Sequence, residues 1–146
     1  MGTNYSLGGS ETGCGIYARG TPNIGNLSCP NPLPGTLPTQ IQFFFLDLIG
    51  LFTEPLDDYT LIAVWAGPND IVNNQDNQNP DEHPEIVLVN NISAHIQGLI
   101  TLGGKNFLVP NMPALGKLPR YVNTEAEEQL DILSTQFNEA LSAALD

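Results

Sequence analysis

The chain has very few positively charged residues. Its 146 residues include four lysines and arginines against 16 aspartates and glutamates, for a formal net charge of -12. The basic residues are scattered along the sequence, at Arg19, Lys105, Lys117 and Arg120. Binding to a phosphate backbone needs clustered cations that displace its counterions. The composition therefore excludes nucleic acid as a partner, and the acidity instead favours solubility.

Long apolar runs are also missing. The longest, Ile41 to Phe52, is interrupted by Gln42 and Asp47, and it is too short to cross a bilayer. The first residues, Met1-Gly2-Thr3, lack the basic start and the apolar core of a secretory signal. We therefore expect no membrane span, and the sequence leaves the compartment open.

Cysteine and histidine are scarce as well. Cys14 and Cys29 are expected to be free thiols, although in an exported protein they could close a loop. A zinc site needs about four ligands, and nothing beside these cysteines has metal-ligand spacing. The acidic segment around His83 could hold a cation loosely, but a solvated loop is the simpler expectation. We expect neither a metal ion nor a cofactor.

The apolar residues that are present, 41% of the chain, suffice for one domain with a real core. Their periodicity predicts helices from about 39 to 50, over 85–102 and over 124–145. Thr124 is expected to cap the last helix, with Glu127 at the capping-box position. Strands are predicted over 1–8, 59–66 and 105–110, with loops over 9–36 and 71–84. This alternation predicts βαβ units, a parallel sheet and right-handed crossovers.

Two segments change abruptly from an extended apolar character to a polar turn. Asn69 and Asp70 follow the run 63–66, at the carboxyl end of a predicted strand, where open α/β sheets bind ligands. The segment from Asn4 to Ser10 likewise starts extended and continues into glycines and hydroxyls. A glycine N–H and an asparagine amide can both point at a developing negative oxygen, so together the segments indicate an oxyanion site.

These residues also carry a family resemblance. Gly67-Pro68-Asn69-Asp70 resembles the G-x-N-D block of the SGNH/GDSL ester hydrolases, and Asn4 to Gly9 resembles that family's glycine block. Phe107 to Pro119 resembles the strand and loop that follow in the lipase-like branch. The blocks occur in the family order over most of the chain. The resemblance implies an incomplete α/β fold of the parallel-sheet, three-layer SGNH-hydrolase (flavodoxin-like) type.

Two catalytic blocks of that family are not found in the sequence. The nucleophile block, of the Gly-Asp-Ser-Leu kind, would precede the glycine block, and no serine here has that context. The base belongs to an Asp-x-x-His block, but Pro80 and Ile92 stand three residues before His83 and His95. We therefore expect residues 1–146 to be a single partial domain from the middle of an enzyme, with no nucleophile of its own.

For the site, the resemblance implies that Asn69 and Gly9 are oxyanion donors, with Gly8 as the alternative to Gly9. Gly67 and Asp70 are expected in support, Asp70 by accepting backbone or hydroxyl hydrogen bonds that buttress the loop. The simpler interpretation is that asparagine and glycines only form tight turns. Outside the site, Trp65 is expected in the core, and His95 is expected as a surface or packing residue.

The function implied by the resemblance is hydrolysis of carboxylic esters, lipid-like or acetylated, through a Ser-His-Asp mechanism. On its own, this chain would supply oxyanion donors and would not turn over. A non-catalytic α/β module that binds a ligand or partner through the same face is the alternative. A third hypothesis is that a complementing chain provides the missing blocks, pairing with an exposed sheet edge.

Overall fold

The computed structural model describes residues 4, 12, 36–50, 56–73 and 83–146. In chain order the elements are α1 (Leu37–Gly50), β1 (Leu61–Ala63), α2 (Pro68–Asn73), α3 (Pro84–Thr101), β2 (Asn106–Leu108), the 3₁₀ helix η2 (Leu115–Lys117) and α4 (Glu127–Leu145). The strand predicted over 1–8 and most of the loop predicted over 9–36 lie outside the described residues, as do Gly8, Gly9, Cys14 and Cys29.

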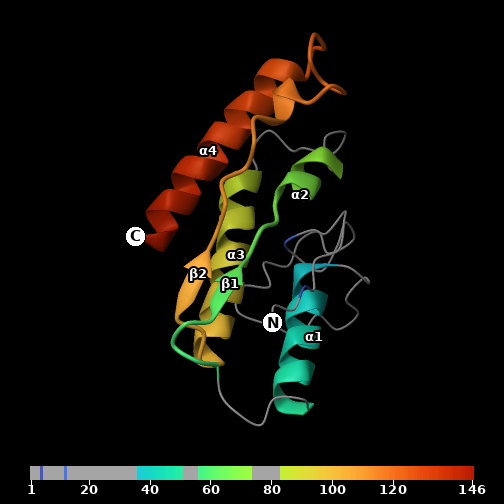
Figure 1. Ribbon diagram of the computed structural model, residues 1–146. Helices are drawn as coiled ribbons and strands as arrows, with labels where there is room; N and C mark the ends of the chain where they lie inside the picture. The colour runs from blue at the N-terminus through green and yellow to red at the C-terminus, as the bar shows by residue number, and fades with distance from the viewer. Residues whose placement is uncertain (1–3, 5–11, 13–35, 51–55, 74–82) are drawn as a thin grey trace.

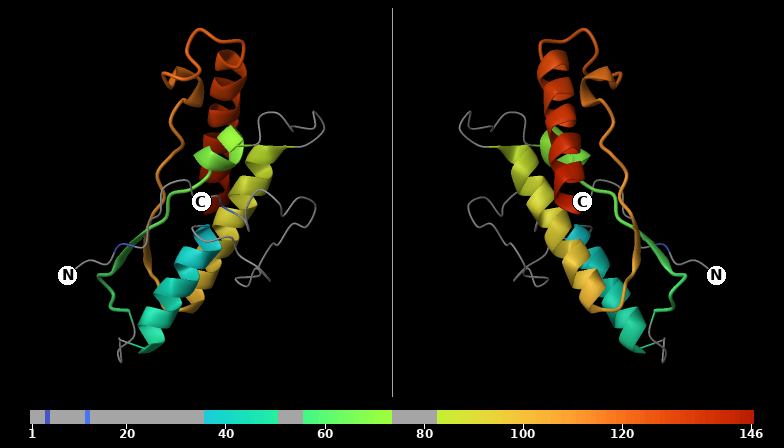
Figure 2. Two further views of the ribbon diagram at one scale, coloured as in Figure 1. Left: turned by 90° about the vertical axis from the view of Figure 1, so that its right-hand side faces the viewer. Right: turned by 90° about the vertical axis from the view of Figure 1, so that its left-hand side faces the viewer.

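Within the described residues the sheet consists of β1 and β2, and their predicted parallel pairing is confirmed. Ile62 lies opposite Phe107 in the register, and the Val64 N–H donates to the Leu108 carbonyl at 2.9 Å beyond the paired residues. Parallel strands need a crossover connection, and α3 lies in it, behind the two strands (Figure 1). The two side views show the strands on one side of α3, with α1 packed along the helix (Figure 2). The fold is α/β and mostly helical, compatible with an incomplete sheet.

The core lies mainly between α3 and α4. Each helix presents an apolar stripe, formed by Leu88, Val89, Ile92, Ile96 and Leu99 on α3 and by Leu130, Leu133, Phe137 and Leu141 on α4. The buried stripes stop short of the helix ends, where Ile86, Ile100 and Ala144 are exposed. Burying a side chain of this size contributes about 1.5–3 kcal/mol. None of the described helices combines the length and apolarity that a membrane crossing requires.

The burial of this sheet differs from the prediction. The almost continuous apolar run over 59–66 is typical of a strand buried on both faces, and Trp65 is predicted in the core. The paired segment is only three residues long, and Leu61, Trp65 and Leu108 are 61%, 58% and 51% exposed. Ile62 and Phe107 instead pack against the core. An apolar run shows that a strand can be buried on both faces, but α3 covers only one face of this sheet.

Two predicted boundaries also differ. Residues 71–73, expected in a loop, complete α2. Thr124 does not cap α4, because its hydroxyl donates to the Tyr121 carbonyl at 2.6 Å and the helix begins only at Glu127. The Glu127 carboxylate accepts the Asn123 N–H instead, from a turn in which Asn123 has a left-handed φ of 62°.

Candidate active site

The turn after β1 depends on Gly67. The chain runs from the buried Val64 and Ala66 into Gly67, whose φ of 120° is accessible to glycine and strained for other residues. A Cβ there would meet the Met112 Cε at 3.1 Å and the Phe137 ring at 3.3 Å. The glycine therefore provides both the backbone conformation and the close approach that this turn requires.

Asn69 and Asp70 lie in the first turn of α2, which starts directly after this glycine. Pro68 occupies the first helical position, where its missing N–H costs no hydrogen bond. Both Asn69 and Asp70 are half-buried beyond the carboxyl end of β1. The sequence predicted an amide and a carboxylate at this edge, and the structure shows them on a short helix.

Asp70 accepts hydrogen bonds from Thr12, which is fully buried. The Thr12 N–H lies 3.0 Å from Oδ1 and 2.9 Å from Oδ2 of Asp70, and the Thr12 hydroxyl donates to Oδ1 at 2.8 Å. Hydrogen bonds to an ionised carboxylate are stronger than neutral ones. Asp70 thus joins α2 to a residue 58 positions earlier in the chain.

The other side of Thr12 is held by α3. Asn91 Nδ2 donates to the Thr12 hydroxyl at 3.2 Å, and His95 Nε2 lies 3.0 Å from the Thr12 carbonyl oxygen. Because a carbonyl only accepts, Nε2 of His95 carries the hydrogen. Asn91 and His95 are four residues apart, so they share one face of α3. Thr12 is therefore bound by two helices through its N–H, carbonyl and hydroxyl groups.

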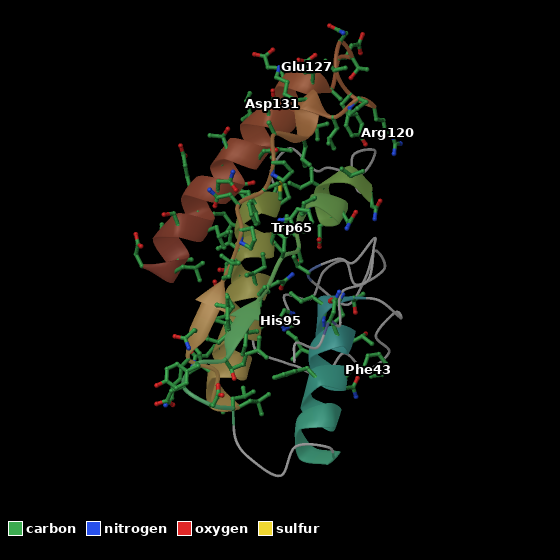
Figure 3. All side chains as sticks on the ribbon, in the orientation of Figure 1. Phe43, Trp65, His95, Arg120, Glu127 and Asp131 are labelled. Atoms are coloured by element: carbon green, nitrogen blue, oxygen red, sulfur yellow. The ribbon has the colours of Figure 1, made fainter. Side chains whose placement is uncertain are left out.

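His95 is a buried packing residue, 6% exposed and directed inward from α3 (Figure 3). Burial lowers the pKa of His95 from its usual value of 6.5, and the hydrogen bond to Thr12 offsets only part of this effect. The imidazole is thus kept neutral in its folded environment. His83, in contrast, is exposed and lies 3.0 Å from Glu85.

The Thr12 contacts are the part of this region that the sequence did not predict. A signal existed in α3, where Asn91 and His95 interrupt the apolar inner face at helical spacing. Nothing around Thr12 marks it, because its partners are distant in the sequence. Over the described ranges, no three His, Cys, Asp or Glu residues could together hold a metal ion.

A surface hollow of about 650 Å³ lies elsewhere, at the start of α4. Its lining includes Lys117, Glu127 and Asp131, and none of Gly67, Asn69 and Asp70. Lys117 pairs there with both carboxylates, so its charge is already compensated. The polar turn at the end of β1, and not this hollow, is therefore the candidate active site.

A parallel βαβ unit with Gly-x-Asn-Asp at the carboxyl end of its first strand places the chain in the α/β class. Residues 26–146 match the family described as GDSL-like Lipase/Acylhydrolase, and the chain belongs to this family. The matched range includes Gly67 to Asp70 and begins after the glycine block. No curated protein and no solved structure matches the chain.

Proposed function

We propose that this chain is the oxyanion-stabilising part of a carboxylic ester hydrolase. In the reaction, a serine from a Gly-Asp-Ser-Leu-like block attacks the ester carbonyl and forms an acyl-enzyme, which water then hydrolyses. The Asn69 side-chain amide and the Gly9 N–H donate to the tetrahedral oxyanion, with Gly8 as the alternative backbone donor. Each such donor lowers the barrier by about 3–4 kcal/mol. The serine and the base come from outside these 146 residues.

The observation that carries the proposal is the position of Asn69. It lies in the family-matched range, in the first turn of α2 and just beyond β1, where the close packing at Gly67 fixes the turn. A rigidly held amide at the carboxyl end of a parallel strand is suited to stabilising developing charge without reorganisation. The complete domain would carry further strands and a helical layer on the open sheet face, giving the three-layer arrangement.

The experiment supplies the missing blocks. The chain is co-expressed with a polypeptide carrying the Gly-Asp-Ser-Leu-like and Asp-x-x-His blocks of a family member, which we call the complemented enzyme. It should hydrolyse short p-nitrophenyl esters, and Asn69→Ala should lower kcat about 100- to 1000-fold. Asn90→Ala, on the exposed face of α3, should leave kcat unchanged. The chain alone should be inactive.

Either of two outcomes contradicts the proposal. One is that the two polypeptides bind each other but show no esterase activity, or that the active complemented enzyme keeps its kcat in Asn69→Ala. The other is esterase activity of the 146-residue chain alone that disappears with Asn69→Ala, because the chain would then carry its own nucleophile.

The second candidate is a non-catalytic module that binds a ligand or a partner through the same face. It is favoured by the lack of both catalytic blocks in the sequence. Equilibrium binding of an ester to the chain alone, lost in Asn69→Ala and retained in Asn90→Ala, would support this function over the catalytic one.

A further inference from the structure

We propose that Thr12, held by Asp70, Asn91 and His95, is a positioning residue for the oxyanion donor Asn69. This inference rests on the proposed function and extends it to residues that do not touch the substrate. These four residues are called the Thr12 clamp below.

The clamp leaves no polar group of Thr12 without a partner. The N–H and the hydroxyl hydrogen go to Asp70, the hydroxyl oxygen accepts from Asn91, and the carbonyl accepts from His95. All of this occurs at a residue with no solvent exposure. Side chains from two helices thus fix both the position and the orientation of the Thr12 backbone.

The clamp reaches the predicted donor Asn69 through its neighbour. Asp70 follows Asn69 directly in the first turn of α2, and its carboxylate is held by the N–H and hydroxyl of Thr12. Thr12 is in turn held by Asn91 and His95 of α3, so the first turn of α2 is tied to the longer helix. A donor must be aligned with the oxyanion within a fraction of an ångström, so the clamp limits how far Asn69 can move.

A purely structural role would give a different result from a positioning role, and two substitutions separate them. Thr12→Val removes the hydroxyl and keeps the branched shape, whereas Thr12→Ser keeps the hydroxyl. The matched control is Ser134→Ala, which removes another buried hydroxyl, one that bonds the Leu115 N–H and the Leu130 carbonyl. Ser134 lies on α4, in neither the clamp nor the polar turn.

In the complemented enzyme, Thr12→Val should lower kcat about 10- to 100-fold with KM nearly unchanged. Thr12→Ser should restore most of kcat, and Ser134→Ala should leave kcat unchanged. The positioning role is overturned if Thr12→Val and Ser134→Ala behave alike, or if Thr12→Ser fails to restore kcat.

Amide exchange in the 146-residue chain tests the clamp without activity. Asp70→Ala should accelerate exchange of the Thr12 amide about tenfold or more, and Ser134→Ala should not. Unchanged exchange in Asp70→Ala overturns the clamp while leaving the proposed function intact. If Asn69→Ala retains full activity while Asp70→Ala accelerates Thr12 exchange, the proposed function and the positioning role are both overturned. The hydrogen bonds of the clamp would then be confirmed without a catalytic role.

Discussion

His95 shows how a buried histidine on an apolar helix face can matter for stability. Its buried ring donates to a backbone carbonyl, so the neutral form fits the site without a counter-charge. Burial lowers its pKa below 6.5, which means that the unfolded chain binds a proton more readily than the folded one.

The stability of the chain should therefore depend on pH through His95. Above pH 6.5 the ring is neutral in both states, and its full contribution to the free energy of unfolding is present. As the pH falls below 6.5, the unfolded state is protonated first, so this contribution declines until the lower folded pKa is passed. Urea titrations between pH 5 and 8 should show this decline in the wild type and not in His95→Gln. A matching decline in His95→Gln would exclude the histidine as its cause, and the exposed His83→Gln serves as the control.

Thr12 and Asn69 differ in whether the sequence alone could single them out. Asn69 was singled out because it follows an apolar run inside a block, Gly67 to Asp70, that resembles a known family, and its oxyanion role stays a prediction. Thr12 was not, because its importance lies in partners more than 50 residues away, and no local pattern encodes them. Gly8 and Gly9 stay predictions.

The helix α4 carries two stripes, and only one of them was predicted. The apolar stripe follows from its periodicity. Beside it runs a polar stripe of Glu127, Asp131, Ser134 and Asn138, whose side chains bond the backbone of the segment that precedes the helix. Asn138 bonds both the N–H and the carbonyl of Met112, at 2.7 and 2.9 Å. Such pairings escape a sequence-based prediction because polar residues on a helix are expected to face water.

Removing the last of these contacts should be costly. Asn138→Ala leaves two backbone groups of the buried Met112 without partners, and each unsatisfied group costs about 1–3 kcal/mol. We expect the free energy of unfolding, measured with urea, to fall by about 2–4 kcal/mol. Gln136→Ala, on the exposed side of the same helix, should change it by less than about 0.5 kcal/mol. A similar effect of both substitutions would show that the polar stripe adds nothing beyond helix propensity.

The sheet divides the protein into a packed side and an open side. The α/β class and the parallel crossover were predictable, because helices and strands alternate along the chain. The open face was not, because an apolar strand has the same sequence pattern whether one of its faces or both are covered. Because only one face is covered, three apolar residues are exposed that a sheet covered on both faces would bury: Leu61, Trp65 and Leu108.

Two neighbours on β1 should therefore respond very differently to the same substitution. Ile62→Gln places an amide against the core and should lower the free energy of unfolding by about 2 kcal/mol or more. Leu61→Gln, at a position 61% exposed, should change it by less than about 0.5 kcal/mol. The free energies of unfolding of the two variants are measured by chemical denaturation at low protein concentration. Equal losses would mean that both faces of the strand are covered in solution.

The register of the three paired positions in the sheet also sets where the candidate site lies along β1. A slip of one residue would move β1 by about 3.3 Å and turn every side chain to the opposite face. Since leucine or isoleucine is tolerable on either face, the apolar pattern alone discriminates poorly between the two alignments. A slip would also bring the Cβ of Ala66 or Pro68 to the place of Gly67, where a Cβ meets the Met112 Cε at 3.1 Å and the Phe137 ring at 3.3 Å. The close packing at Gly67 thus disfavours a shifted alignment of β1 and keeps Asn69 at its position beyond the strand.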